Sequence, residues 1–422
     1  MLYLLLDSIR NWLIDLGAYR LFSVLDQLQF RALAAAALSF LLVLLLGRRT
    51  IAWLTRKKIG DSGLTDAQAL RATANAKANT PTMGGILIVG SILTSVLLLA
   101  DLSQRYVQLG IVVVVWLAVL GSMDDWLKLT AKSRGSSSRQ GLYAWEKLVF
   151  QLGLGVLVGY FLFASPPAPE QAPGEARLAH VVNLPFQKTY VGVGRARPAG
   201  EPAPVPAPAS PTTAAPTPIE PTLTVNPNLF YFSMPIFIVW AMLFITGMSN
   251  AVNITDGMDG LAGGISAAVM MGVFVLALIA GDEDTAKYLL VPFLPGAGEL
   301  AVLAGATAGA CLGFMWWNCS PAHVFMGDTG ALSLGGIVGY TAVALRQEYV
   351  VIVMSGVFLA EIASVALQVG YFRATGGKRI FRCAPYHHHL HMGGWPEPQV
   401  VTRLWIISII LVVMALASVK LR

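Results

Sequence analysis

The sequence predicts an all-α integral membrane protein, and three observations lead to this fold class. Of the 422 residues, 55% are hydrophobic and only 12% are charged, whereas soluble domains carry about 25% charged residues. Ten segments are apolar over the roughly 20 residues that a helix needs to cross a bilayer, where the backbone must satisfy its own hydrogen bonds. Lysine and arginine are dense in every second loop, which is typical of a multi-pass protein. We expect no nucleic-acid partner.

The ten predicted spans and the loops between them define a topology. The spans lie near 24–46, 82–100, 107–123, 146–164, 231–249, 261–281, 298–316, 330–346, 349–371 and 401–420. Seven, five and five basic residues fall in the loops at 47–81, 124–147 and 372–403. Because basic loops remain in the cytoplasm, we expect these three loops there and both termini outside. Residues 1–20 lack an apolar core of signal-peptide length, so we expect no cleaved signal peptide.

The chain divides into three predicted regions. Residues 1–164 hold the first four spans, residues 165–230 form a proline-rich periplasmic segment, and residues 231–422 hold the last six spans. Fifteen of the 23 prolines lie in the middle region, which is typical of a semi-rigid spacer with too little apolar content to fold. The stretches LAHVVNLPF and NPNLFYF flank this spacer and could pair as a small periplasmic hairpin.

Two adjacent carboxylates follow the third predicted span. Asp124 and Asp125 stand directly after a long apolar run, in VLGSMDDWLKL. Carboxylates at membrane depth are expensive and mark functional sites. A divalent cation would explain why both are kept, and the alternative is a pair of solvated aspartates that cap the helix end.

Amides and carboxylates recur at three-residue steps after the fifth span. Asn250, Asn253, Asp256 and Asp259 fall in GMSNAVNITDGMDGLAGG, a spacing that places them along a slowly turning helical face. The glycines between them allow close backbone approach, as phosphate-binding turns require. The structural alternative is a glycine-rich turn whose aspartates only cap helices.

Further candidates flank the second and eighth spans. Asn318 and Asp328 lie near a predicted cytoplasmic end, and the ring of Phe325 between them could stack on a planar base. Lys77 and Thr82 precede the second span. Alternatively, Asp328 and Thr82 cap helices and Lys77 is one more cytoplasmic lysine.

Histidines and one intramembrane acid complete the set. His387, His388 and His389 are consecutive in a predicted cytoplasmic loop. Glu361 lies inside the ninth span, where an ionisable residue indicates function by default. A structural pairing of Glu361 with an arginine is the alternative.

Two metals are compatible with these residues. Carboxylate oxygens favour Mg²⁺, which binds substrate phosphates through one or two carboxylates, and this indicates phosphate transfer at a membrane surface. The alternative is zinc held by Cys319, His323, Cys383 and His387. A transporter is a further alternative, but the polar groups of a transporter should lie near the middle of the spans and recur in two repeated halves. Here they lie at the predicted cytoplasmic ends, and the sequence shows no internal repeat.

The chain resembles the phospho-N-acetylmuramoyl-pentapeptide transferases of the polyprenyl-phosphate hexose-1-phosphate transferase superfamily. The resemblance rests on TPTMGG, DDWLK, GMSNAVNITDGMDGLAGG, VFMGDTGALSLGG, APYHHH and GWPEPQVVTRLWIISIIL. It covers the chain except the proline-rich insert. One departure is that the acidic residue expected soon after the three histidines is missing, and His391 stands nearby instead.

The resemblance implies an enzyme of the bacterial inner membrane with its active site on the cytoplasmic face. Its reaction would move phospho-MurNAc-pentapeptide from UDP-MurNAc-pentapeptide to undecaprenyl phosphate, giving lipid I and UMP for peptidoglycan synthesis. Mg²⁺ dependence and a homodimer within the lipid bilayer are implied as well. The alternative is a sibling enzyme that transfers GlcNAc-1-phosphate from UDP-GlcNAc to a polyprenyl phosphate, but HHH and GWPEP argue against it.

The resemblance also implies roles for individual residues. The catalytic set would be Asp124, Asp125 and Asp328, with Asp328 also a metal ligand. Asp124 would deprotonate or orient the lipid phosphate, and both direct transfer and a covalent aspartyl-phosphate route stay open. The substrate would be bound by Lys77, Thr82, Asn253, Asp256, Asp259, Asn318, Phe325, His387, His388 and His389, with Lys132, Asn250 and Glu361 as further candidates.

Overall fold

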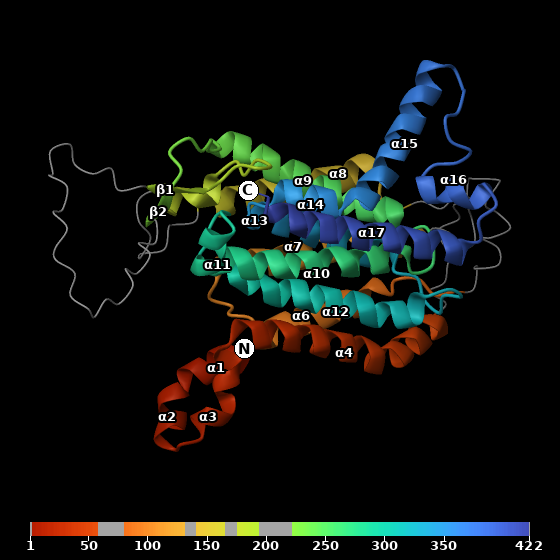
Figure 1. Ribbon diagram of the computed structural model, residues 1–422. Helices are drawn as coiled ribbons and strands as arrows, with labels where there is room; N and C mark the ends of the chain where they lie inside the picture. Colours follow the sequence, from red (N-terminus) through yellow and green to blue (C-terminus); the bar gives the residue numbers. More distant parts are fainter. Residues whose placement is uncertain (1, 58–79, 131–140, 165–174, 194–221, 422) are drawn as a thin grey trace, which may run out of the picture.

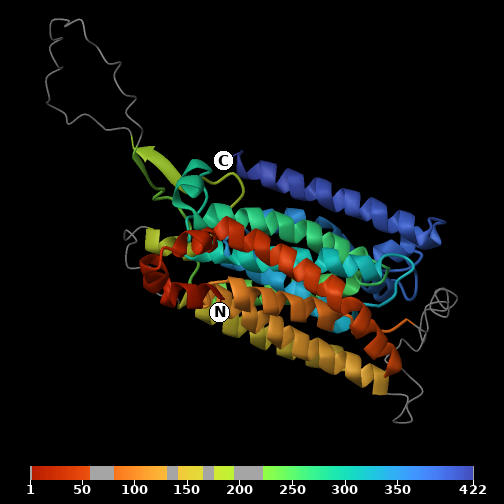
Figure 2. The same ribbon diagram turned by 90° about the horizontal axis from the view of Figure 1, so that it is seen from below.

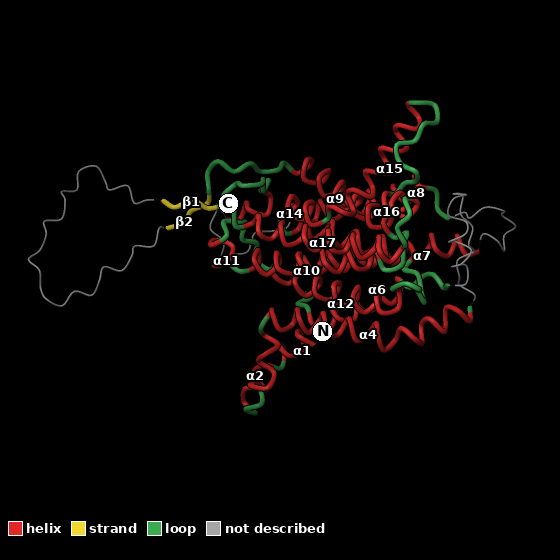
Figure 3. Tube along the Cα trace, turned by 45° about the vertical axis from the view of Figure 1, so that its right-hand side comes forward, coloured by secondary structure: helices red, strands yellow, loops and turns green. Residues whose placement is uncertain are grey.

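The structure is a computed structural model that describes residues 2–57, 80–130, 141–164, 175–193 and 222–421. Over these ranges the molecule is a bundle of long helices that run between two ends (Figure 1). Helices dominate the trace, and one short pair of strands projects from it (Figure 3). The predicted all-α class is therefore confirmed.

Eight helices within these ranges are long and apolar enough to cross a membrane. They are α4 (Leu28–Arg56), α7 (Arg105–Thr130), α8 (Ala144–Phe163), α9 (Met234–Thr255), α10 (Leu261–Gly281), α12 (Leu300–Asn318, which follows the 3-10 turn Ala297–Glu299), α15 (Gly356–Ala374) and α17 (Glu397–Val419). Two other predicted spans are also helical, as α6 (Gly85–Leu99) and the glycine-rich α13 (Gly327–Ala344). The count of ten spans stays a prediction.

Short elements surround the bundle. They are α1 (Leu2–Ser8), α2 (Arg10–Asp15), α3 (Tyr19–Phe22), α11 (Glu283–Tyr288), α14 (Glu348–Met354), α16 (Tyr386–Met392) and the 3-10 turns Ser23–Asp26 and Glu175–His180. The ninth predicted span is divided, because Ser355 separates α14 from α15. After this break, α15 leaves the bundle at an angle (Figure 1), so the expectation of one continuous span is wrong here.

Small residues let the central helices approach closely. Gly305, Gly309 and Gly313 follow one face of α12 against α4, and a Cβ at Gly309 would lie 2.0 Å from the carbonyl oxygen of Ala36. On α13, a Cβ at Gly335 would lie 2.3 Å from the carbonyl oxygen of Met248 on α9. Small residues at four-residue spacing are typical of helix contacts within membranes. The close contact with α9 brings the first turn of α13 beside the last turns of α9.

The two ends of the bundle differ. At one end, β1 (Tyr190–Val193) pairs antiparallel with β2 (Thr222–Val225), and the C-terminus lies nearby (Figures 1 and 2). We call this the hairpin end; the opposite end carries α16 (Figure 1). An isolated bridge joins Val181 to Tyr231, so the two flanking stretches pair at this one position, and β1 and β2 lie between them in the sequence. The three predicted regions stay a prediction, since 165–174 and 194–221 fall outside the described residues.

Candidate active site

Three carboxylates converge at the α16 end. Asp124 and Asp125 lie near the end of α7, and Asp328 lies in the first turn of α13. Each offers one oxygen atom, and these oxygens lie within 4.8 Å of one another. The sequence placed both aspartates after the third span, but α7 continues to Thr130. The predicted acidic set is therefore built from two packed helices.

Two lysines bridge Asp124 and Asp328. Lys128 Nζ lies 2.5 Å from Asp124 Oδ2 and 3.2 Å from Asp328 Oδ1. Lys147 Nζ, from α8, lies 2.7 Å from Asp124 Oδ2 and 2.6 Å from Asp328 Oδ2. Sequence reasoning counted both lysines only as cytoplasmic charge. The four-residue spacing from Asp124 to Lys128 was a usable signal, whereas nothing local indicates Lys147.

Asp125 has a different environment, because it caps α13. Its two carboxylate oxygens accept the backbone N–H groups of Asp328 and Thr329, both at 3.0 Å, and the Thr329 hydroxyl at 2.7 Å. Gly327 has φ +71°, and a Cβ there would lie 2.7 Å from Asp125 Oδ2. Asp328 therefore does not act as the cap of its own helix; Asp125 holds that helix, and so holds Asp328 in place.

The amide and carboxylate series after the fifth span is split by the end of α9 at Thr255. Asn253 Nδ2 donates to Asp328 Oδ1 at 3.1 Å, so Asn253 joins the cluster. Asn250 Nδ2 instead donates to Gln151 Oε1 on α8 at 2.8 Å. The expectation of one continuous helical face is wrong, since residues 256–260 form a turn between α9 and α10.

Asp256 and Asp259 occupy this turn. Burial raises the pKa of Asp256, and the nearby carboxylates of Asp328, Asp125 and Asp259 raise it further, to about 7. Asp259 Oδ2 accepts the backbone N–H of Ala322 at 3.1 Å. The turn thus places two more carboxyl groups beside a region that already holds three, and the raised pKa of Asp256 reflects this concentration of acidic groups.

Asn318 braces the loops around the site. Its Oδ1 accepts the backbone N–H of Gly260 at 2.9 Å, and its Nδ2 donates to the carbonyl oxygen of Val324 at 2.8 Å. Both polar atoms are therefore bonded to backbone, and the side chain is buried. Asn318 sets the distance between two loops at this end of the bundle.

The segment before α6 lies against the residues before α13. The carbonyl oxygen of Phe325 accepts the N–H of Gly84, and the N–H of Phe325 donates to the carbonyl oxygen of Pro81, both at 2.8 Å. Thr82 is buried between these bonds. These backbone bonds bring the segments of Phe325 and Thr82 together, and the substrate-binding role of both residues stays a prediction. Lys77 and Lys132 lie outside the described residues.

The three consecutive histidines occupy α16 and have different surroundings. His387 is fully buried, with Nδ1 3.1 Å from Glu361 Oε2. His389 Nδ1 accepts the backbone N–H of Arg382 at 3.1 Å. His388 lies between them in the chain, half-buried. Successive residues of a helix point about 100° apart, so one substrate cannot be held in the same way by all three. Glu361 pairs with a histidine, and the alternative of an arginine partner is wrong.

The zinc alternative requires Cys319, His323, Cys383 and His387 to meet. Among the described residues, the group with metal-ligand geometry is the aspartate cluster, and these four residues form no such group. The His387 ring is already bonded to Glu361. The structure therefore does not support a zinc site.

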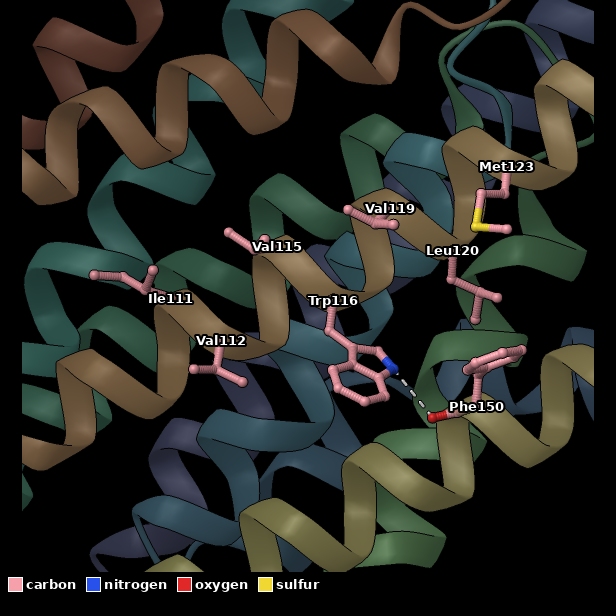
Figure 4. Close-up of a pocket in the computed structure, with 8 residues that line it drawn as sticks. All are labelled: Ile111, Val112, Val115, Trp116, Val119, Leu120, Met123 and Phe150. Atoms are coloured by element: carbon pink, nitrogen blue, oxygen red, sulfur yellow. Dashed lines mark hydrogen bonds between the residues drawn. The ribbon is translucent and has the colours of Figure 1, made fainter.

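An apolar groove with a volume of about 510 Å³ runs between α7 and α8 (Figure 4). Val115, Val119 and Met123 line it at four-residue steps, and Met123 directly precedes the two adjacent carboxylates. Trp116 lies across the groove, and its Nε1 donates to the carbonyl oxygen of Phe150 at 3.1 Å. This lining suits contact with lipid chains.

Comparisons with known proteins show which families the sequence matches. The profile described as Glycosyl transferase family 4 matches residues 209–346, and the phospho-N-acetylmuramoyl-pentapeptide-transferase signature 1 matches residues 77–89. A phospho-N-acetylmuramoyl-pentapeptide-transferase of Thermodesulfovibrio yellowstonii is 37% identical over 422 residues, which cover 100% of both chains. A protein of the same name from Desulfotalea psychrophila is 38% identical over 408 residues, 96% of this chain and 97% of the relative. Another, from Gemmatimonas aurantiaca, is 39% identical over 435 residues and covers 100% of both chains.

Proposed function

This chain belongs to the phospho-N-acetylmuramoyl-pentapeptide-transferase family, and on that premise we propose its reaction, its metal and the residues that act. It transfers phospho-MurNAc-pentapeptide from UDP-MurNAc-pentapeptide to undecaprenyl phosphate, giving lipid I and UMP in peptidoglycan synthesis. The cluster of Asp124, Asp125 and Asp328 is the observation that supports this reaction most directly. Transfer of a phosphoryl group requires positive charge close to the reacting phosphates. The cluster offers carboxylates that could hold a metal ion, and two lysines that are themselves positively charged.

The cluster is suited to Mg²⁺. Carboxylate oxygens are the ligands that Mg²⁺ prefers, and here three carboxylates each offer an oxygen within 4.8 Å of the others. Both oxygens of Asp125 accept backbone N–H groups of α13, whereas both oxygens of Asp328, and Oδ2 of Asp124, contact lysine and asparagine side chains that can rearrange. Asp328 and Asp124 would therefore hold the ion. A bound Mg²⁺ would neutralise the charge that develops on the substrate diphosphate.

Side chains of the cluster would take part in the transfer step. An oxygen of undecaprenyl phosphate attacks the phosphorus that carries the sugar, and the bond from that phosphorus to the UMP oxygen breaks, so UMP leaves. Asp124 is fully buried and would orient or deprotonate the attacking phosphate. Lys128 and Lys147, which lie between Asp124 and Asp328, would balance the phosphate charges as the bond breaks.

The membrane topology and the assembly belong to the same proposal. The aspartate cluster lies at the end of the bundle that carries α16, away from the hairpin end. The basic loops predicted to be cytoplasmic adjoin these helix ends, so the active site would face the cytoplasm and the hairpin the periplasm. The protein would sit in the bacterial inner membrane, and the family resemblance favours a homodimer.

A UMP-release assay tests the function. The purified protein receives undecaprenyl phosphate and Mg²⁺, with either UDP-MurNAc-pentapeptide or UDP-GlcNAc as the donor. We expect UMP from the first donor and none above background from the second. UMP release from UDP-GlcNAc alone would contradict the proposed substrate and favour the sibling activity.

A further inference from the structure

Glu361 and His387 form a buried pair at the α16 end that the proposed chemistry does not use. Their exposed fractions are 1% and 0%. Glu361 Oε2 accepts both the backbone N–H of His387, at 3.2 Å, and its ring Nδ1, at 3.1 Å. Since α15 carries Glu361 and α16 carries His387, the pair fixes the short helix to the longer one.

The other ring nitrogen of His387 faces the turn at 256–260. His387 Nε2 is buried and has no hydrogen-bond partner in the described part of the chain. A Cβ added at Gly257 would lie 2.4 Å from this nitrogen, so the ring edge packs directly on the glycine backbone. No room remains there for a ligand between His387 and the turn.

The same turn is held from its other side. The backbone N–H of Asp259 donates to Glu397 Oε1 of α17 at 2.9 Å, and Trp405 Nε1 donates to the carbonyl oxygen of Gly260 at 3.2 Å. The turn carries Asp256 and Asp259 beside the aspartate cluster. Its position is thus set by contacts from α16 and α17, of which His387 supplies the contact at Gly257.

We propose that Glu361 and His387 are positioning residues that set the turn at 256–260, and that they act on binding of the uridine-nucleotide donor through this turn. The inference rests on the proposed function and on the substrate-binding roles that the family resemblance implies for Asp256 and Asp259, which we assign to the donor. It also divides the roles within α16. His387 supports the turn from behind, His388 Nε2 lies 3.5 Å from the Cβ position at Gly257, and His389 instead accepts the backbone N–H of Arg382.

The kinetic test uses Glu361→Ala and Glu361→Gln in the full-length protein. We expect Glu361→Ala to raise the KM for UDP-MurNAc-pentapeptide about 10- to 100-fold, the range for displaced site elements, and to leave the KM for undecaprenyl phosphate unchanged. Glu361→Gln should recover most of this loss, because its amide oxygen accepts the same two N–H groups. An equal rise in both KM values, or no recovery in Glu361→Gln, would overturn the proposal.

A matched control separates positioning from general stability. Glu348 is also 1% exposed, but it lies at the hairpin end, where it pairs with Arg346. Glu348→Gln should lower the melting temperature without changing the KM for the donor. If Glu348→Gln raises that KM as much as Glu361→Ala does, the effect is only loss of stability and the proposal is wrong.

A double-mutant cycle on Gly257 and His387 tests the contact itself and needs no transferase activity. Gly257→Ala should lower the melting temperature because of the contact with His387, whereas Gly247→Ala, where a Cβ meets nothing within 4 Å, should not. Adding His387→Ala to Gly257→Ala should remove the extra loss, since contacting residues are non-additive. Additive losses would overturn the contact.

Failure of the proposed function would instead appear as a wild type that releases no UMP from UDP-MurNAc-pentapeptide.

Discussion

The two ends of the bundle both bury ionic groups, but they balance the charges differently. At the hairpin end, Arg31 meets Glu299 through two N–H groups, at 2.9 and 2.5 Å, and both side chains are buried. At the α16 end, two lysines face three carboxylates, with Asp256 close by. Arginine suits a fixed planar pair, whereas lysine is a mobile point charge. A pair in which the charges balance indicates a structural role, and a cluster with surplus negative charge indicates a group that could hold a metal ion.

The largest effect should come from Asp328, the carboxylate that contacts both lysines and Asn253. We expect Asp328→Asn to lower turnover by about 10²–10⁴-fold, because it removes a carboxylate that would hold Mg²⁺ against the transferring phosphate. The measurement is UMP release by protein whose melting temperature shows that it is folded. Wild-type turnover in Asp328→Asn at low Mg²⁺ would remove Asp328 from the catalytic set.

A smaller loss is expected at Lys147. Lys147→Ala removes one of the two cations that bridge Asp124 and Asp328, while Lys128 remains, so turnover should fall about 10- to 100-fold. Lys287, at the hairpin end, pairs with Glu283 on the surface, and Lys287→Ala serves as the control. Equal activity in both variants would show that the α16-end lysine is only structural.

At the hairpin end the effect should fall on stability alone. Glu299→Gln leaves Arg31 buried without its counter-charge, which costs about 3–5 kcal/mol of unfolding free energy. Thermal denaturation in detergent measures this loss, and turnover per folded molecule should stay at the wild-type level. A turnover loss as large as that of Asp328→Asn would break the distinction between the two ends.

The smallest effect is a pH dependence at Asp256. Its pKa of about 7 lies above the ordinary value of 3.8, so the folded state binds the proton more tightly and the free energy of unfolding falls as pH rises from about 4 to 7. Asp256→Asn removes this loss. Without Mg²⁺, it should raise the melting temperature by about 2–4 °C at pH 8 and by less at pH 5. A larger gain at pH 5 would contradict the raised pKa.

Sequence reasoning reached the fold class and the acidic set for different reasons. Long apolar runs and the alternation of basic loops report on the bilayer, so the helices were predictable one by one. Asp124 and Asp125 were recognisable because adjacent carboxylates beside an apolar run have few structural uses. Their convergence with Asp328 was inferred from topology and family resemblance.

The missed features depend on contacts between distant segments. Lys147 enters the cluster only because α8 packs beside α7, and Asp125 caps a helix more than 200 residues away. The partner of Glu361 is His387, 26 residues further along the chain, whereas the structural alternative for Glu361 was an ion pair with an arginine. Nor did hydropathy show the break at Ser355, because apolar residues continue on both sides of it. These features require the packed bundle.

Cation binding tests the difference between the two ends most directly. Isothermal titration of the purified wild type with Mg²⁺ should show a saturable site that Asp328→Asn removes and Glu299→Gln retains, and UMP release should follow the occupancy of that site. If Asp328→Asn binds Mg²⁺ like the wild type, or if Glu299→Gln loses the site instead, the surplus negative charge at the α16 end does not serve to hold the metal.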